Sequence, residues 1–208
     1  MFRFDEDKTV VFFDYETFNL CLSFLHNRPW QLGLLTMENG EKTQAENLYI
    51  GWETDLKISD DAARITRYNK KTHDEKALPQ KEVFETMYEA FEKADWIIGH
   101  NIIGFDLHLF KEWCLVNKAD WKKLLPKFID SNCVAKGIAL GLQPDPKDDF
   151  THYQYRLYHH RARGIKTSLT ALGKQLEIDV DYDNLHDALN DIELNRLVWD
   201  KLKFQIER

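Results

Sequence analysis

Three strand-like segments precede the first helical segment of this chain, and that order limits the possible folds more than any other feature. The segments are rich in β-branched and aromatic residues and lie at Thr9–Phe13, Gln31–Thr36 and Asn47–Trp52. The Asn39-Gly40 dipeptide between the last two segments is typical of a tight hairpin turn. Because short turns join antiparallel neighbours, we expect the chain to begin with three antiparallel strands.

Further along the chain, short apolar strands alternate with helices. Apolar residues recur at helical spacing over residues 80–93 and 105–116, and short apolar runs at residues 96–98 and 128–129 indicate buried strands. Three more helices are predicted, over residues 134–140, 168–176 and 188–202. Strands that alternate with helices pair in parallel, so we predict an α/β fold with a mixed sheet flanked by helices. Residues 1–208 are interpreted as a single domain in which residues 143–155, with two prolines, form a loop.

The composition excludes several classes of protein. Hydrophobic residues make up 43% of the chain and charged residues 30%, which is ordinary for a globular protein and unlike a disordered one. The longest apolar runs have four residues, whereas a membrane span needs about 20. Acidic residues near the N-terminus do not fit a signal peptide. Three widely spaced cysteines indicate reduced thiols, so we expect a cytoplasmic protein with no membrane partner.

The net charge of −7 argues against a protein that coats nucleic acid through bulk electrostatics. It leaves room for an enzyme that reaches nucleic acid through metal ions, since such an enzyme needs carboxylates at its centre. The distribution of charge along the chain therefore matters more than the sum.

The first candidate site is the Asp14-Tyr15-Glu16 segment at the end of the first predicted strand. Residues two apart in a strand point to the same face, so Asp14 and Glu16 project together. Adjacent carboxylates repel each other unless a cation lies between them, and hard divalent cations such as Mg²⁺ prefer oxygen ligands. A charged strand end at the surface would have the same sequence, so this motif alone leaves both interpretations open.

Two later groups are candidates to complete such a site. Asp106 follows a predicted buried strand and opens the next helix, with Asn101 in the turn between them. An acid at this edge of an α/β sheet fits a site, and it fits a simple helix cap as well. His186 and Asp191 flank the start of the last predicted helix. Five residues correspond to about 140° around a helix, so these two side chains converge only if His186 lies on the preceding loop; a solvated helix start is the alternative.

Taken in order, the three groups resemble the motifs of a known family. D-x-E at Asp14, N-x3-F-D at Asn101 and H-x4-D at His186 are similar to the motifs of the histidine-bearing branch of the DEDD superfamily of 3′→5′ exonucleases. The resemblance runs over residues 10–201, nearly the whole chain. Its motifs are specific in combination and weak singly.

The closer likeness is to the exonuclease domain of the bacterial exonuclease I family. The segments at residues 13–18 and 28–31 look like two segments of that domain, although Asn19 stands where the family has glycine. Asp130 is similar to the acid that the family carries between its second and third motifs.

The resemblance implies a ribonuclease-H-like fold and the hydrolysis of single-stranded DNA to mononucleotides from its 3′ end. It implies two Mg²⁺ ions, for which we expect Mn²⁺ to substitute. The implied catalytic residues are four metal ligands and a general base, namely Asp14, Glu16, Asp106, Asp191 and His186. An imidazole suits the role of base because its ordinary pKa, about 6.5, lies near working pH.

The resemblance also implies that Thr17, Phe18 and Asn101 bind substrate, although Phe18 is equally compatible with a place in the core. A nucleic-acid strand needs a path with positive charge and aromatic rings. Residues 152–166 interleave tyrosines with basic residues. We expect the cationic side chains of this segment to bind substrate, and a solvated loop is the alternative; they are Arg156, Arg161, Arg163 and Lys166.

Several other functions share these residues. The same centre would serve an exoribonuclease on short RNA or a proofreading subunit of a polymerase, and single-stranded DNA is preferred only because the closer likeness is to a DNA enzyme. A single-strand nucleic-acid binding module with an inactive centre is the alternative from a different class. Zinc hydrolysis is disfavoured because the candidate ligands are carboxylates rather than histidines or cysteines. Protein partners and oligomeric state stay open.

Overall fold

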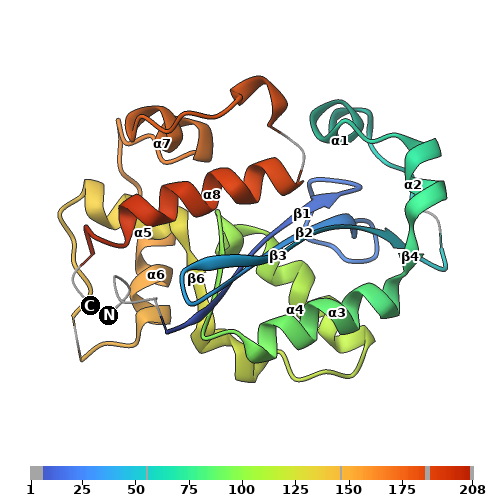
Figure 1. Ribbon diagram of the computed structural model, residues 1–208, viewed down its shortest axis with the longest axis horizontal. Coiled ribbons are helices and arrows are strands. Elements are labelled where there is room, and N and C mark those ends of the chain that lie inside the picture. The colour runs from blue at the N-terminus through green and yellow to red at the C-terminus, as the bar shows by residue number, and fades with distance from the viewer. Residues whose placement is uncertain (1–6, 55, 146, 186–187, 207–208) are drawn as a thin grey trace.

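A six-stranded mixed sheet forms the centre of the molecule (Figure 1). The structure, a computed structural model, describes residues 7–54, 56–145, 147–185 and 188–206. The strand order is β4-β3-β2-β1-β5-β6. The strands are β1 (Thr9–Thr17), β2 (Pro29–Glu38), β3 (Glu41–Gly51), β4 (Leu78–Pro79), β5 (Trp96–Gly99) and β6 (Phe128–Asp130).

The first three strands form the predicted antiparallel meander. β1 pairs antiparallel with β2, and β2 pairs antiparallel with β3. Asn39 and Gly40 both have positive φ, as the predicted tight turn requires. β5 then pairs parallel with β1, and β6 pairs parallel with β5. The predicted α/β class with a mixed sheet is therefore confirmed.

Helices cover both faces of the sheet (Figure 1). They are α1 (Asp60–Thr66), α2 (Lys70–Lys76), α3 (Gln80–Lys93), α4 (Asp106–Val116), α5 (Ser131–Ala139), α6 (Phe150–His159), α7 (Leu169–Gln175) and α8 (Ala188–Leu202), with 3₁₀ turns η1 (Ile102–Gly104), η2 (Lys122–Lys127) and η3 (Tyr182–Asn184). α5 to α8 pack on one face, where Phe12 joins their buried apolar residues. α3 and α4 pack on the other face, where Phe13 and Tyr15 lie.

The predicted loop over residues 143–155 is wrong in its second half. α6 begins at Phe150, where the side chain of Asp149 caps the helix by accepting a hydrogen bond from the N–H of Thr151. Phe150, Tyr153 and Leu157 are buried in the apolar cluster to which α5 also contributes. Their spacing of three and four residues is typical of a helix, but the prolines just before them favoured the interpretation of the whole segment as a loop.

Sequence analysis also did not predict α1, α2 and β4. Ser59 and Asn69 cap the two helices with their side chains, accepting hydrogen bonds from the N–H groups of Ala62 and Thr72. The helices themselves are short and largely polar, so they lack the apolar periodicity that reveals α3. Among the described residues, no helix combines the length and the apolar character needed to cross a membrane.

Candidate active site

β1 brings two of the predicted acids to one face of the sheet. Phe13 and Tyr15 are buried on the α3 side, so the alternation of the strand turns Asp14 and Glu16 toward α8. Glu16 is 7% exposed and Asp14 is half-buried. The strand runs on to Thr17 because β2 pairs with it along its whole length. The two carboxylates therefore stand on a central strand of the sheet.

Asp191, in the first turn of α8, completes a group of three. One carboxylate oxygen from each of Asp14, Glu16 and Asp191 lies within 4.8 Å of the others. Gly33 of β2, which is the register partner of Asp14, allows this approach. A Cβ atom on Gly33 would lie 2.9 Å from the carbonyl oxygen of Ala188, the first residue of α8. A side chain at position 33 would therefore push the start of α8 away from the carboxylates.

Asp106 reaches the same centre from the first turn of α4. β5 pairs with β1 only as far as Phe12, which leaves the N–H of Tyr15 beyond the paired region. The Asp106 carboxylate accepts a hydrogen bond from that N–H. Asp106 is 5% exposed, and its charge acts on Asp14. Asp106 thus lies near enough to act on Asp14, although the acids whose oxygens lie within 4.8 Å of one another are Asp14, Glu16 and Asp191.

The charges of these four acids disfavour one another. Burial raises the pKa of Asp14 well above its ordinary value, and the neighbouring carboxylates of Asp106, Glu16 and Asp191 raise it further. Burial also raises the pKa of Asp106 to about 7. A concentration of oxygen donors with elevated pKa values fits a hard divalent cation, which would let the carboxylates ionise together. The donor set therefore fits the divalent ions that the sequence implied.

Asp130 shapes the turn that leads to Asp106. It is 1% exposed, and its carboxylate accepts hydrogen bonds from the N–H groups of Asn101 (2.9 Å) and Ile103 (3.0 Å). The same carboxylate caps α5 through the N–H groups of Asn132 and Cys133. Burial raises its pKa, while these hydrogen bonds lower it. Asp130 therefore holds the backbone between β5 and α4 in place.

A polar network ties this turn to α8. His100 Nδ1 lies 2.9 Å from the hydroxyl of Ser131, which donates to Oδ1 of Asn195 at 2.7 Å. Burial lowers the pKa of His100 to about 4, so its ring is neutral near pH 7. The hydroxyl of Thr167 donates to Asn132 Oδ1 and joins the segment after α6 to the same network. Sequence analysis missed this network because its members come from four separate segments.

The three residues predicted to bind substrate next to the acids lie in different surroundings. Thr17 is buried, and its hydroxyl donates to the carbonyl of Asn19 at 2.7 Å. Phe18 is buried, with its ring centroid 6.0 Å from that of Tyr68. Asn101 is exposed and has a φ of 62°. The Phe18 ring is thus packed, and the predicted contact of Phe18 with substrate stays a prediction.

The basic segment lies against the turn before Asp106. A Cβ atom on Gly104 would lie 2.9 Å from the ring of Tyr158, so the end of α6 touches η1. Tyr155 and Tyr158 are exposed there. Arg156 pairs with Asp148 at 3.1 Å. The other three predicted cations, Arg161, Arg163 and Lys166, are exposed on the segment that follows α6.

His186, the predicted general base, lies outside the described residues, as does Asp187. The described chain resumes at Ala188, where α8 starts. The role of His186 stays a prediction.

Comparison with known families and structures gives a consistent result. Residues 11–197 match the model of the exonuclease family RNase_T. No curated protein sequence matches the chain.

Solved structures of E. coli exonuclease I share the fold. The complex with a dT13 oligonucleotide has a TM-score of 0.72 and 19% identity, over 95% of this chain and 41% of that one. The zinc-bound form with single-stranded DNA has a TM-score of 0.72 and 18% identity, over 96% and 41%. The complex named ExoI/SSB-Ct has a TM-score of 0.66 and 19% identity, over 95% and 43%. The chain thus spans about two fifths of the length of these structures.

Proposed function

Because this chain belongs to the RNase_T exonuclease family, as sequence analysis predicted, we propose that it releases mononucleotides from the 3′ end of single-stranded DNA. Membership identifies it as an exonuclease, a hydrolase of nucleic acid that depends on divalent metal ions. The direction, the single-stranded DNA substrate and the catalytic roles below are proposals. We also propose that residues 1–208 act as one exonuclease domain.

The observation that carries the proposal is the meeting of Asp14, Glu16 and Asp191, whose oxygens lie within 4.8 Å of one another. In the proposal these three residues would hold one ion, and Asp14 would hold a second ion with help from Asp106. We propose Mg²⁺ as the ion, with Mn²⁺ as a substitute. Two such ions supply a hydroxide at neutral pH and relieve negative charge on the phosphate and the leaving oxygen.

His186 takes the proton of the attacking water in this proposal. A positioned general base typically contributes about 10²–10⁴-fold to a rate. We expect His186→Ala to lower turnover by this factor in single-turnover assays and to leave Mn²⁺ affinity, measured by calorimetry, unchanged. Unaltered turnover in this variant would remove His186 from the mechanism and leave the metal site standing.

The proposed strand path starts at the exposed end of α6. Tyr155 and Tyr158 offer stacking surfaces, since bases stack on aromatic rings without regard to sequence, and Tyr158 contacts the turn that leads to Asp106. Exposed cations follow on the same segment, at Arg161, Arg163 and Lys166. The structures of exonuclease I solved with oligonucleotides support a single-stranded substrate. We also propose that Thr17, Phe18 and Asn101 bind the terminal nucleotide beside the acids, and that Arg156 on α6 belongs to the path.

A degradation assay tests the proposal. Single-stranded DNA, duplex DNA and short RNA are each labelled at the 3′ or the 5′ end and incubated with Mg²⁺, Mn²⁺ or EDTA. We expect immediate release of labelled mononucleotide from 3′-labelled single-stranded DNA with either metal, and none in EDTA. If RNA is cleaved faster than single-stranded DNA, the protein is an exoribonuclease and the proposed substrate is wrong. If nucleic acid is bound and not cleaved, the protein is a binding module.

Glu16→Gln with a matched control tests the acids themselves. Glu38→Gln, at the other end of the β1–β2 pair and exposed, removes an equal charge far from the centre. We expect Glu16→Gln to lose cleavage while Glu38→Gln keeps it. Equal activity in both variants would contradict the assignment.

A further inference from the structure

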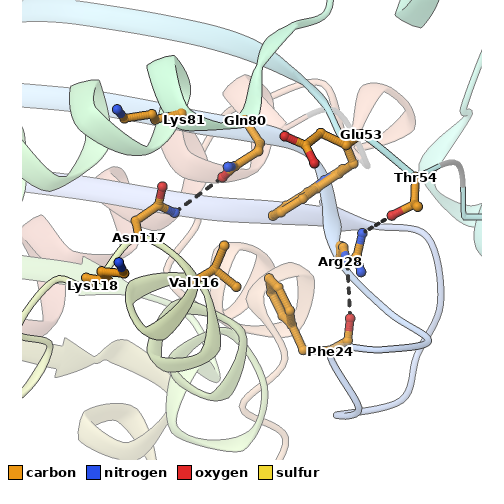
Figure 2. A pocket seen from close by; sticks show the side chains of 10 residues that line it. Phe24, Arg28, Glu53, Thr54, Gln80, Lys81, Val116, Asn117 and Lys118 are labelled. Atoms are coloured by element: carbon orange, nitrogen blue, oxygen red, sulfur yellow. Dashed lines mark hydrogen bonds between the residues drawn. The ribbon is translucent and has the colours of Figure 1, made fainter.

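A hollow lies on the opposite face of the sheet from the carboxylates, and nothing in the proposed function uses it. It has a volume of about 530 Å³, within the usual range for small-ligand pockets. The loop before β2, the end of β3, the start of α3 and the end of α4 enclose it. Figure 2 shows Arg28 and Thr54 on one side, Asn117 and Lys118 on the other, and Val116 between them.

The hollow is positively charged although the protein is acidic. Its charged lining residues are Arg28, Lys81, Lys118 and Glu53, in a chain of net charge −7. Lys81 lies 3.7 Å from Glu85 on its own helix. Among the described residues, no ion pair is made by Arg28 or by Lys118. These two cations therefore line the hollow without an ion pair among the described residues, and Glu53 is the acid that shares the lining with them.

Arg28 is held in a fixed orientation. Its guanidinium carbon lies 5.1 Å from the ring centroid of Trp52 and 5.6 Å from that of Phe24. Its Nε donates to the carbonyl of Phe24, and its Nη1 donates to the hydroxyl of Thr54. A guanidinium positioned in this way loses little conformational entropy when it binds a phosphate.

The N-terminus of α3 adds to the preference of the hollow for an anion. α3, which has 14 residues, begins there at Gln80, and no side chain caps its N-terminus. The positive end of its dipole and its first N–H groups are therefore available to an anion. The carbonyl end of α4 is satisfied instead, since the side chain of Asn117 donates to the carbonyl of Trp113 at 3.0 Å.

The apolar part of the lining favours a ligand with a planar ring. Val116 is 54% exposed, and the rings of Phe24 and Trp52 are only half-buried. The side-chain oxygen of Gln80 already accepts from Trp113 and Asn117, which leaves its amide N–H groups as donors. We propose that this hollow binds a nucleotide, with the phosphate held by Arg28 and Lys118 and the base against the apolar part of the lining. This inference stands apart from the proposed cleavage because the hollow contains none of its residues.

Calorimetry with deoxyadenosine 5′-monophosphate in EDTA tests the proposal on the full chain. EDTA removes metal, so the four carboxylates repel the phosphate and do not contribute binding. We expect saturable binding that Lys118→Glu weakens at least about tenfold, as the loss of a charge-assisted contact does. Lys201→Glu, which reverses another exposed lysine, on α8, should leave affinity unchanged. Arg28→Gln should weaken binding similarly, with Arg28→Lys intermediate.

Two further ligands locate the interaction. Deoxyadenosine and inorganic phosphate should each bind at least about tenfold more weakly than the nucleotide, since each lacks half of the proposed contacts. A phosphorothioate oligonucleotide distinguishes the two possible ligands. If it binds more tightly than the nucleotide and loses that advantage in Lys118→Glu, the natural ligand is a nucleic-acid strand. If it binds as tightly as the nucleotide, the natural ligand is the free nucleotide. Absence of binding to the wild-type chain, equal affinity in Lys118→Glu, or phosphate binding as tightly as the nucleotide would overturn the proposal.

Discussion

The two faces of β1 at its carboxyl end carry opposite kinds of side chain. On the α8 face, Asp14 and Glu16 stand among carboxylates whose charges repel one another. On the α3 face, Phe13 packs its ring 5.1 Å from that of Phe91, and the hydroxyl of Tyr15 donates to the sulfur of Met87. The alternation of one strand thus places the repelling carboxylates on one face of the sheet and packed aromatic rings on the other. Burial of the apolar side chains on one face offsets the unfavourable free energy of the repelling carboxylates on the other.

The largest expected effect comes from neutralising the acidic face. Asp14→Asn should lower cleavage by about a thousandfold or more, the scale of loss on removing a catalytic group. The same variant should be more stable than the wild type in EDTA, because the pKa of Asp14 is raised and its ionised form disfavours folding near pH 7. Single-turnover rates and urea unfolding in EDTA measure the two effects. A variant that loses both activity and stability would show that Asp14 supports the fold rather than the chemistry.

The apolar face should give the opposite result. Tyr15→Ala should lower the free energy of unfolding by about 3–5 kcal/mol, as loss of a large buried ring does. Tyr15→Phe removes only the hydroxyl contact with Met87 and should cost about 1 kcal/mol. Urea unfolding measures both, and Tyr15→Phe should keep its cleavage rate. A large drop in rate for Tyr15→Phe would mean that the two faces are not independent.

Gly33→Ala tests the spacing between the acidic face and α8. The added methyl group would meet the Ala188 carbonyl, so α8 and Asp191 must move away from Asp14. A displacement of about 1 Å can lower a rate about 100-fold, and the strain should cost about 1–3 kcal/mol of stability. Cleavage assays and thermal unfolding measure these effects. Wild-type activity in this variant would show that the site tolerates a shifted α8.

The smallest expected effect is the pH dependence of metal-free stability. The folded-state pKa of Asp106 is raised to about 7, so its contribution to stability is present below its ordinary pKa, about 4, and is lost as pH rises toward 7. The pKa of His100 is lowered to about 4, so its contribution has the opposite sign and is lost as pH falls below about 6.5.

Asp106→Asn and His100→Asn should separate these contributions in thermal scans in EDTA at several pH values. We expect shifts of a few degrees in Tm, with Mg²⁺ stabilising the wild type more at pH 8 than at pH 5. A Mg²⁺ effect of the same size at both pH values would contradict the assignment of ionised carboxylates as its ligands.

Sequence patterns predicted most of the fold where apolar residues recur with the period of the element. α3 and α8 begin and end at the predicted residues because each buries an apolar stripe against the sheet. The helices α1 and α2 were missed because their stability comes from caps and polar residues. The first half of the 143–155 loop was predicted correctly, and α6 was missed because its apolar signal starts directly after the prolines.

The candidate site was predictable as a set of residue types and not as a geometry. D-x-E on a strand predicts that Asp14 and Glu16 share a face, and this holds. No local pattern places Asp191 or Asp106 beside them, since that depends on Gly33 admitting α8 and on β5 ending before Tyr15. The hollow beside Arg28 escaped sequence analysis for the same reason, because its lining comes from four separated segments.

The side chain of Asp130 has a consequence for how the molecule loosens. One carboxylate accepts hydrogen bonds from both the bend after β5 and the first turn of α5, so a displacement of Asp130 loosens both. Fluctuations at these two places should be a single cooperative event rather than two local ones. The backbone between β5 and Asp106 is short and irregular, but we expect it to be as rigid as the first turn of α5, to which Asp130 links it.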